Sequence, residues 1–243
     1  MPPDRRRSSR PFVALAVVAV LAVASIGGWI VLRGTAASSD QDAAASVAVP
    51  AVDVTAATPT TRASTTTTST IPRQVAGERL LPGPATVYVL GDSVMLGAKD
   101  RVPAAMPGWT VTFDSKVSRR LDEGIAIVAG RPAPIARVLV VHLCTNWFGG
   151  DYRAEAAKLL DAAKGVERVV WVTCVPWRPE VQAADDVIRS LPDQYPQVVV
   201  ADWRVIAGEP GYTAGDRLHL DGPGAIAMAS LVAGTVGPAP SPG

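Results

Sequence analysis

Three short segments of this sequence carry side chains that together could perform acyl transfer. Ser93 follows Gly91 and Asp92 directly after an apolar run, where a strand would end and a helix would begin. Asp216 and His219 lie three residues apart, just before the last apolar segment. An imidazole that is held by a carboxylate can take a proton from a serine hydroxyl, whose oxygen then attacks an ester carbonyl. The pattern predicts Ser93 as nucleophile, His219 as its base and Asp216 as the group that orients the imidazole.

Such an attack places negative charge on the carbonyl oxygen, and two positions are suited to stabilise it. A helix that begins at Ser93 would present unpaired backbone N–H groups to that oxygen. Asn146 follows the third of the apolar runs that are expected to be strands and could aim its side-chain amide at the same place. Other readings stay open. Ser93 could be a simple helix N-cap, Asn146 could stabilise its own loop, and the Asp216 segment could be an ordinary turn.

Five short apolar runs, rich in β-branched residues, are expected to be the strands that position these side chains. They cover residues 86–90, 109–113, 137–143, 169–173 and 198–201. Helices are expected at residues 94–105, 119–129, 152–164, 180–191 and 223–236. Continuous apolar strands that alternate with helices are typical of parallel sheets covered on both faces. We therefore expect an α/β fold, a three-layer α/β/α sandwich around a five-stranded parallel sheet, with ligands bound at the carboxyl ends of the strands.

The order of these motifs resembles the SGNH, or GDSL-type, hydrolase superfamily. The resemblance rests on Gly-Asp-Ser-Val-Met-Leu-Gly-Ala at 91–98, Thr-Asn at 145–146 and Asp-Arg-Leu-His-Leu at 216–220. With the segments 113–120 and 201–203, the chain looks like the extracytoplasmic domain of bacterial peptidoglycan O-acetyltransferases and related envelope acyltransferases. The similarity covers roughly residues 86–231. It implies a flavodoxin-like SGNH fold.

The resemblance also implies a role for each residue of the site. It makes Ser93 the nucleophile, assisted by Asp216 and His219. It builds the oxyanion hole from the backbone N–H groups of Ser93 and Ser118 and from the side chain of Asn146. Ser118 stands where the family has a glycine, so a Cβ crowds the hole and a positive φ would be costly. The reaction that it implies needs no metal and no organic cofactor.

The chain has two cysteines and two histidines, which excludes a cysteine-rich zinc site. Cys144 stands where the family usually has a glycine, and both Cys144 and Cys174 end strands that should be neighbours. Parallel neighbours lie about 4.8 Å apart, close to the Cα separation of a disulfide. We predict a Cys144–Cys174 disulfide, with two buried thiols as the alternative. His142, inside an apolar strand, is expected to be a packed and hydrogen-bonded core residue.

Four further side chains near the predicted strand ends have less specific roles. Asp92 and Asp202 are expected to be structural groups at the ends of strands. Trp147 and Trp177 lie just past strand ends, where they could stack on a sugar ring or simply pack their loops.

An uncharged apolar run at residues 12–32 is 21 residues long, enough for a helix to span the core of a bilayer. Four arginines precede it within residues 5–10, whereas only Arg33 follows closely. The positive-inside rule then places residues 1–11 in the cytoplasm and the rest outside. We expect a single-pass plasma-membrane anchor, with a cleaved signal peptide as the alternative.

The remaining organisation follows from composition. Residues 33–84 are rich in Ala, Ser, Thr and Pro and are expected to be a disordered linker. Residues 85–236 are expected to be the folded domain and residues 237–243 a disordered tail. Lys and Arg number 23 and Asp and Glu 22, a balance that argues against a nucleic-acid partner.

Together these features predict a membrane-anchored, extracytoplasmic serine esterase or O-acyltransferase. Its substrate would be an acylated carbohydrate of the cell envelope, most simply an acetyl ester, or a small ester. Esterase and transferase share every site residue, and a transferase would need a separate multi-pass membrane protein as acyl donor. The alternative is a catalytically weak wall-binding or scaffolding module that kept the fold, which the replacements at Ser118 and Cys144 would explain.

Overall fold

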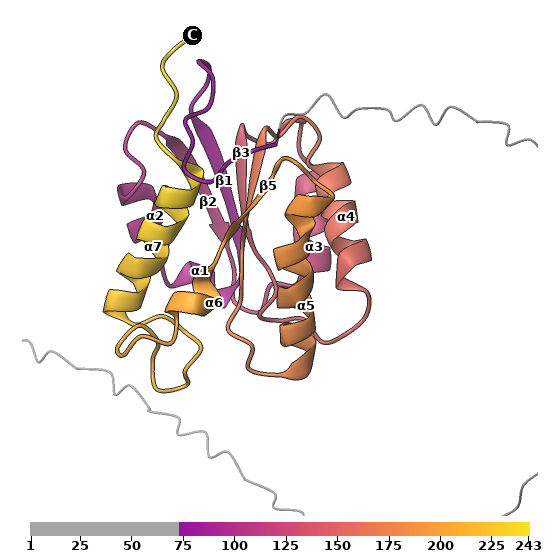
Figure 1. Cartoon of the computed structure of the whole chain (residues 1–243), viewed down its shortest axis with the longest axis vertical. Helices are drawn as coiled ribbons and strands as arrows, with labels where there is room; N and C mark the ends of the chain where they lie inside the picture. Colours follow the sequence, from indigo (N-terminus) through magenta and orange to yellow (C-terminus); the bar gives the residue numbers. More distant parts are fainter. Residues whose placement is uncertain (1–72) are drawn as a thin grey trace, which may run out of the picture. The chain divides into compact units, whose positions relative to one another are not determined.

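The computed structural model describes residues 73–243, and its centre is one sheet of five parallel strands (Figure 1). The sheet runs in the order β2-β1-β3-β4-β5. The strands are β1 (Thr86–Gly91), β2 (Thr110–Ser115), β3 (Val138–His142), β4 (Arg168–Val172) and β5 (Val198–Ala201). Each expected strand is present, with bounds that differ by at most two residues. The predicted parallel sheet is therefore confirmed.

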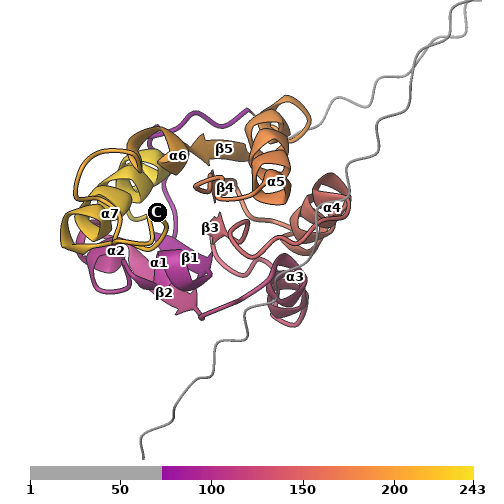
Figure 2. The same cartoon turned by 90° about the horizontal axis from the view of Figure 1, so that it is seen from below.

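Helices cover both faces of the sheet, so the three layers predicted from the sequence are present (Figure 2). One face carries α3 (Leu121–Ala129), α4 (Tyr152–Ala162) and α5 (Pro179–Ser190), which continues into the 3₁₀ turn η1 (Leu191–Asp193). The other face carries α1 (Ser93–Leu96), α2 (Arg101–Ala104), α6 (Trp203–Ile206) and α7 (Gly222–Val236).

The apolar runs form strands because both of their faces are buried. Every residue of β3 is buried, and its side chains alternate between two hydrophobic clusters. Leu139 and Val141 face the cluster under α3, α4 and α5, whereas Val138 and Val140 face the cluster under α7. A strand with helices on both sides has no polar face to show, which explains the continuous β-branched pattern.

The expected helix at residues 94–105 is wrong, because the structure has two four-residue helices, α1 and α2, in its place. In one continuous helix the ring of Pro103 would meet the carbonyl four residues earlier and would remove a hydrogen bond. The break after Gly97 lets Pro103 fall in the first turn of a new helix, where a proline is tolerated. The sequence also gave no indication of α6.

The predicted linker extends too far, since its last residues pack on the domain. Leu80 is buried, and the backbone N–H of Gly77 donates to the carbonyl of Thr235 over 2.9 Å. The buried guanidinium of Arg168 donates to the carbonyls of Glu78 and Val236, at 2.8 and 2.6 Å. A buried arginine needs such acceptors, and the polar segment before the first strand supplies one of them.

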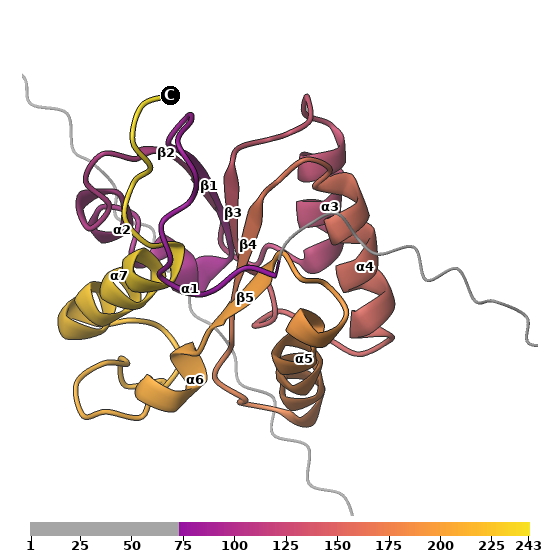
Figure 3. The ribbon, with the colours of Figure 1, turned by 45° about the horizontal axis from the view of Figure 1, so that its top comes forward.

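The predicted disordered tail is likewise wrong, because residues 237–243 run beside the segment that leads into β1 (Figure 3). The N–H of Gly83 donates to the carbonyl of Ser241 over 3.1 Å, and the indole of Trp109 donates to the carbonyl of Gly237 over 3.0 Å. These bonds join backbone to backbone or to one distant side chain. Amino-acid composition therefore gives little indication of these hydrogen bonds.

The predictions for the N-terminal part concern residues that the structure does not describe. The expected membrane helix at 12–32 and most of the expected linker lie outside residues 73–243. Within residues 73–243, no helix has the length and apolar character needed to cross a membrane.

The predicted disulfide is present. Cys144 and Cys174 follow the neighbouring strands β3 and β4, their Cα atoms are 5.9 Å apart, and their sulfur atoms are bonded. The bond joins the two loops that leave the centre of the sheet at its carboxyl edge.

Removal of this disulfide should destabilise the domain. The bond closes a loop with a sequence separation of 30 residues, so its loss frees the unfolded chain by about 3–4 kcal/mol. We expect the double variant Cys144→Ala, Cys174→Ala to lose about that much free energy of unfolding in urea titrations. The wild-type chain, denatured without reductant, should show no free thiol. Two free thiols, or an unfolding midpoint that reduction leaves unchanged, would contradict the prediction.

Candidate active site

Four segments that carry the predicted site residues meet at the carboxyl edge of the sheet. Ser93 opens α1 directly after β1, Ser118 lies in the loop after β2, and Asn146 lies in the loop after β3. His219 comes from the loop before α7, which returns to the same edge. Parallel strands all end on one side, so residues far apart in sequence become neighbours there.

A buried aspartate shapes the turn that carries Ser93. Asp92 is fully buried and accepts a hydrogen bond from the N–H of Val94 over 3.0 Å, so Asp92 is the N-cap of α1. The reading of Ser93 as the N-cap is therefore wrong. Gly91 is required just before, because a Cβ there would lie 2.4 Å from the Cβ of Met95 and 2.6 Å from the Oγ of Ser115. The tight turn directs the serine hydroxyl toward His219.

The pair of Asp216 and His219 is built within a single turn. One carboxylate oxygen of Asp216 accepts the backbone N–H groups of Leu218 and His219, both over 3.0 Å. The other oxygen lies 2.6 Å from Nδ1 of His219. On the far side of the ring, Nε2 of His219 lies 3.0 Å from Oγ of Ser93. The reading of this segment as a turn is therefore correct, and the same turn holds the imidazole where the acid–base interpretation needs it.

The hydrogen bond from His219 lowers the pKa of Asp216 to about 2, with help from the two backbone N–H groups. At neutral pH, Asp216 is therefore ionised and can only accept hydrogen bonds, so Nδ1 of His219 carries the proton between them. In the neutral ring, Nε2 then offers its lone pair to Ser93. Because this pKa lies below the unfolded value of about 3.9, the contribution to stability is complete above about pH 4. It is lost as the pH falls toward 2.

The proposed oxyanion groups lie beside one another. Ser118 has φ of 58°, the left-handed conformation that the sequence marked as costly for a residue with a Cβ. The side-chain amide of Asn146 donates to the carbonyl of Arg119 over 3.2 Å. An amide nitrogen has two N–H groups, so one is engaged by this loop and the other can be aimed at an oxyanion.

The sequence pattern assigns no role to Arg119, yet its side chain links the Ser118 loop to the end of β1. Its guanidinium is buried and donates to the carbonyl of Gly91 at 3.3 Å. It also donates to the carbonyl and to the carboxylate of Asp114, both at 2.6 Å. The loop that carries Ser118 is thereby fixed to the end of β1, next to Ser93. The only sequence signal was an Asp and an Arg on either side of the Ser118 segment.

Asp114 in turn is held by the phenol of Tyr88, which donates to it over 2.6 Å. Burial and this carboxylate raise the pKa of Tyr88 to about 12. Burial alone would raise the pKa of Asp114, but the hydrogen bonds from Tyr88 and Arg119 outweigh it, and the pKa of Asp114 is lowered. The carboxylate that anchors Arg119 is therefore ionised.

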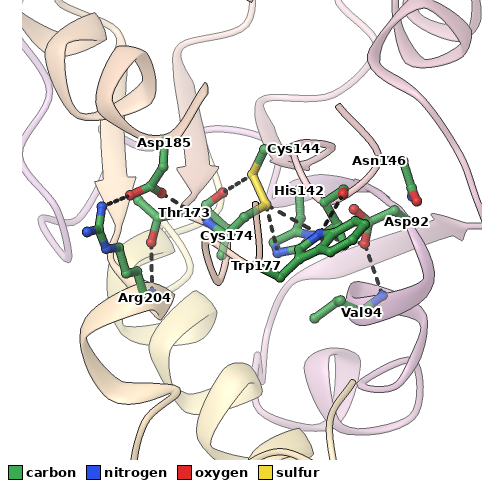
Figure 4. The surroundings of a disulfide bond; sticks show 12 residues. Asp92, Val94, His142, Cys144, Asn146, Thr173, Cys174, Trp177, Asp185 and Arg204 are labelled. Carbon is green, nitrogen blue, oxygen red and sulfur yellow. Dashed lines mark hydrogen bonds and ion pairs between the residues drawn. A yellow bond between two sulfur atoms is a disulfide. The ribbon is translucent and has the colours of Figure 1, made fainter. Parts of the chain in front are cut away.

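A second histidine lies beneath the turn that carries Ser93. His142 is fully buried, its Nδ1 lies 3.0 Å from the carboxylate of Asp92, and its Nε2 lies 3.6 Å from the sulfur of Cys174 (Figure 4). The prediction of a packed, hydrogen-bonded histidine is confirmed. The hydroxyl of Thr145 lies 3.5 Å from the same sulfur, which has no proton in a disulfide, so the hydroxyl donates. The disulfide is thus in contact with the groups that support Ser93.

The cluster of His142, Cys144 and Cys174 brings three potential metal ligands within 4.8 Å of one another in the described part of the chain. Thiolates bind metals, whereas the two sulfurs here are bonded to each other. With the disulfide formed, the cluster does not have the ligand set of a metal centre.

The remaining residues that the sequence singled out have structural contacts. Asp202 forms a bidentate ion pair with Arg189, with N···O distances of 2.5 and 2.7 Å. It also accepts a hydrogen bond from the hydroxyl of Thr173 over 3.0 Å. This agrees with the structural role that was expected. Trp147 packs edge-on against Tyr152, with ring centroids 5.0 Å apart. Trp177, in contrast, is 51% exposed.

No family model and no curated protein matches this sequence. Solved structures do match. The C-terminal catalytic domain of peptidoglycan O-acetyltransferase A from Streptococcus pneumoniae, with a methylsulfonyl adduct, is 23% identical, with a TM-score of 0.52 over 65% of this chain and 91% of that one. A GDSL-like lipase from Bacteroides thetaiotaomicron is 17% identical, with a TM-score of 0.50 over 61% and 85%. A lipolytic G-D-S-L family protein from Veillonella parvula is 12% identical, with a TM-score of 0.50 over 60% and 95%.

Ser118 provides a test of backbone strain in the site. Glycine adopts its positive φ without the Cβ penalty of about 1–2 kcal/mol. We expect Ser118→Gly to keep the free energy of unfolding within about 1 kcal/mol of wild type, because the relief of strain is offset by the freer unfolded chain. Ser118→Val, which is β-branched, should be clearly less stable. Equal stability of the two variants in urea titrations would refute this account.

Asp92 should matter for stability through its two buried partners. Asp92→Ala leaves the N–H of Val94 and the Nδ1–H of His142 without their acceptor, which should cost about 2–4 kcal/mol of unfolding free energy. Asp92→Asn keeps one side-chain oxygen and should cost less. Thermal or urea unfolding of the two variants side by side decides the point, and equal losses would argue against the hydrogen-bonded arrangement.

Proposed function

We propose that this chain, which has the fold of the SGNH, GDSL-type hydrolases, is a serine-dependent esterase or O-acyltransferase. Its substrates are acyl esters of cell-envelope carbohydrate, with acetyl as the simplest acyl group. The observation that carries the proposal is the 3.0 Å approach of His219 Nε2 to Ser93 Oγ, with Asp216 behind the ring at 2.6 Å. A hydroxyl, an imidazole and a carboxylate in that order are the working parts of acyl transfer.

In the first half of the reaction, Oγ of Ser93 attacks the ester carbonyl carbon while Nε2 of His219 takes the hydroxyl proton. Asp216 stabilises the imidazolium that results. The carbon–oxygen bond to the leaving alcohol then breaks, His219 returns the proton to that alcohol, and the acyl group remains on Ser93. The N–H groups of Ser93 and Ser118 and the amide of Asn146 stabilise the oxyanion.

In the second half, water or a sugar hydroxyl attacks the acyl-enzyme. His219 takes the proton of the attacking group, the acyl–oxygen bond to Ser93 breaks, and the serine recovers its proton. Water gives an esterase and a sugar hydroxyl gives a transferase. As a transferase, the protein would receive its acyl group from a separate multi-pass membrane protein.

The exposure of the site supports a polymeric substrate. Ser93 is half-buried, and the side chains of His219 and Asp216 are 45% and 50% exposed. The reacting groups therefore stand at an open surface. A single ester on a long glycan chain can reach such a site without the chain entering a closed cavity.

We also propose that the domain is extracytoplasmic and held by one N-terminal span. The uncharged run at 12–32 and the arginines before it support this topology. A disulfide between Cys144 and Cys174 suits an exported protein, since disulfides persist in oxidising compartments. Protease accessibility of the domain in intact spheroplasts, with the N-terminus protected, tests the topology.

The central test is labelling of the full chain by a fluorophosphonate probe, which reacts with activated serines. We expect labelling of the wild type and none of Ser93→Ala. Turnover of a model ester should fall by about 10³–10⁴-fold or more in His219→Ala and Asp216→Asn. Labelling that persists in Ser93→Ala would refute the assignment of the nucleophile. A wild type that is not labelled would favour the wall-binding alternative.

The pH dependence follows from the same geometry. The pKa of Asp216 lies at about 2, so Asp216 keeps its charge at mildly acidic pH. We expect the profile of kcat/KM against pH to show no ionisation of Asp216 in that range. Release of acetate from acetylated wall glycans, compared with acetylation of de-acetylated glycans from a model ester donor, then separates esterase from transferase.

A further inference from the structure

Two aromatic rings lie exposed at the carboxyl edge of the sheet. Among residues 73–243, seven large apolar side chains are exposed, and only Phe148 and Trp177 among them are aromatic, at 63% and 51%. They come from the loop after β3 and from the loop after β4. Large rings are normally covered in a soluble domain, so an adjacent pair in solvent indicates a contact surface.

The rings are held in place although they are exposed. The indole N–H of Trp177 donates to the carbonyl of Thr145 over 3.1 Å, next to the disulfide (Figure 4). The guanidinium carbon of Arg178 lies 3.9 Å from the ring centroid of Phe148 and 4.4 Å from that of Trp177. Arg178 also donates to the carbonyl of Trp147. The surface is therefore preorganised, which reduces the entropy cost of binding.

This surface is directly connected to the oxyanion loop. Thr145, which anchors Trp177, is the neighbour of Asn146, and the disulfide joins the same two loops. Asn146 in turn contacts the loop that carries Ser118. The two rings are therefore carried by loops that lie next to the Asn146 side of the candidate site.

The chemistry of the surface suits a pyranose ring. The guanidinium covers one side of each aromatic ring, so the exposed area belongs to the other side and the edges. The C–H face of a pyranose packs on such a surface. The carboxylate of Glu180, 4.0 Å from Arg178, adds acceptors for hydroxyl and amide hydrogens, and Arg178 adds donors.

Charge argues against a bilayer as the occupant. The exposed carboxylate of Glu180 lies 4.0 Å from Arg178 and offsets its positive charge, so the surface offers no net cation to an anionic lipid headgroup. We infer that Phe148, Trp177 and Arg178 form a subsite for the sugar next to the acylated one. This inference rests on the proposed function and names where its carbohydrate substrate binds.

The test compares a glycan ester with a small ester in the full chain, purified in detergent. Phe148→Ala should lower kcat/KM for an acetylated glycan oligosaccharide about five- to tenfold relative to kcat/KM for p-nitrophenyl acetate, through KM. Trp177→Phe keeps a ring and should have a smaller effect. Val205→Ala removes an equally exposed apolar side chain from α6 and serves as the matched control, with wild-type values for both substrates. An unchanged glycan KM in Phe148→Ala would overturn the inference.

A binding measurement separates this inference from the proposed function. The Ser93→Ala chain should bind the glycan, and the Ser93→Ala, Phe148→Ala double variant should bind it about five- to tenfold more weakly. Weaker glycan binding by the double variant, together with a wild type that shows no serine-dependent turnover, would support the subsite and refute the esterase or transferase. Equal glycan binding by the two variants, together with serine-dependent turnover by the wild type, would support the enzyme and refute the subsite.

Two further outcomes would show that the rings of Phe148 and Trp177 contact a partner other than a sugar, and either would overturn the inference. In vesicles that contain brominated lipid, the emission difference between wild type and Trp177→Phe reports Trp177 alone, and its quenching would place the ring against the bilayer. An oligomer that Phe148→Ala dissociates would assign the rings to a second copy of the chain.

Discussion

The candidate site depends on one carboxylate. Asp216 accepts two backbone N–H groups of its own turn and the Nδ1–H of His219, so a single side chain folds the loop, sets the tautomer and aims the ring. The imidazole then reaches a serine 126 residues away in sequence. Because the same hydrogen bonds keep Asp216 ionised, the structural role of the turn and its chemical role cannot be separated.

A buried scaffold under the carboxyl edge supports this arrangement. Asp92 caps α1 and accepts from His142, which contacts the disulfide. Arg119 joins the loop after β2 to the end of β1. These groups are buried beneath the candidate site, and they fix the relative positions of the loops that carry Ser93, Ser118 and Asn146. A site on loops gains precision when such partners lock them. The strained backbone at Ser118 persists because these contacts hold its loop.

Local patterns predicted much of this. Continuous apolar runs gave the strands and the layers, since residues buried on both faces leave no polar signal to misread. Ser93 and Asn146 stand out because they directly follow such runs, where the ends of parallel strands meet, whereas His219 stands out by its spacing from Asp216 before the last apolar segment. The misses have physical causes. Hydrophobic periodicity predicts one helix at residues 94–105, but Pro103 requires a separate second helix. The tail from Gly237 onward is held by hydrogen bonds to its backbone, which amino-acid composition cannot predict.

By itself, the sequence determined the α/β class, the parallel sheet and the residue types available for acyl chemistry, because burial and turn preferences are local properties. The tertiary structure alone decided that Ser93 faces His219, that Asp92 rather than Ser93 caps α1, and that Arg119 holds the Ser118 loop. Each of these is a contact between distant segments. Such contacts exist only once the sheet has brought the ends of its strands to one edge.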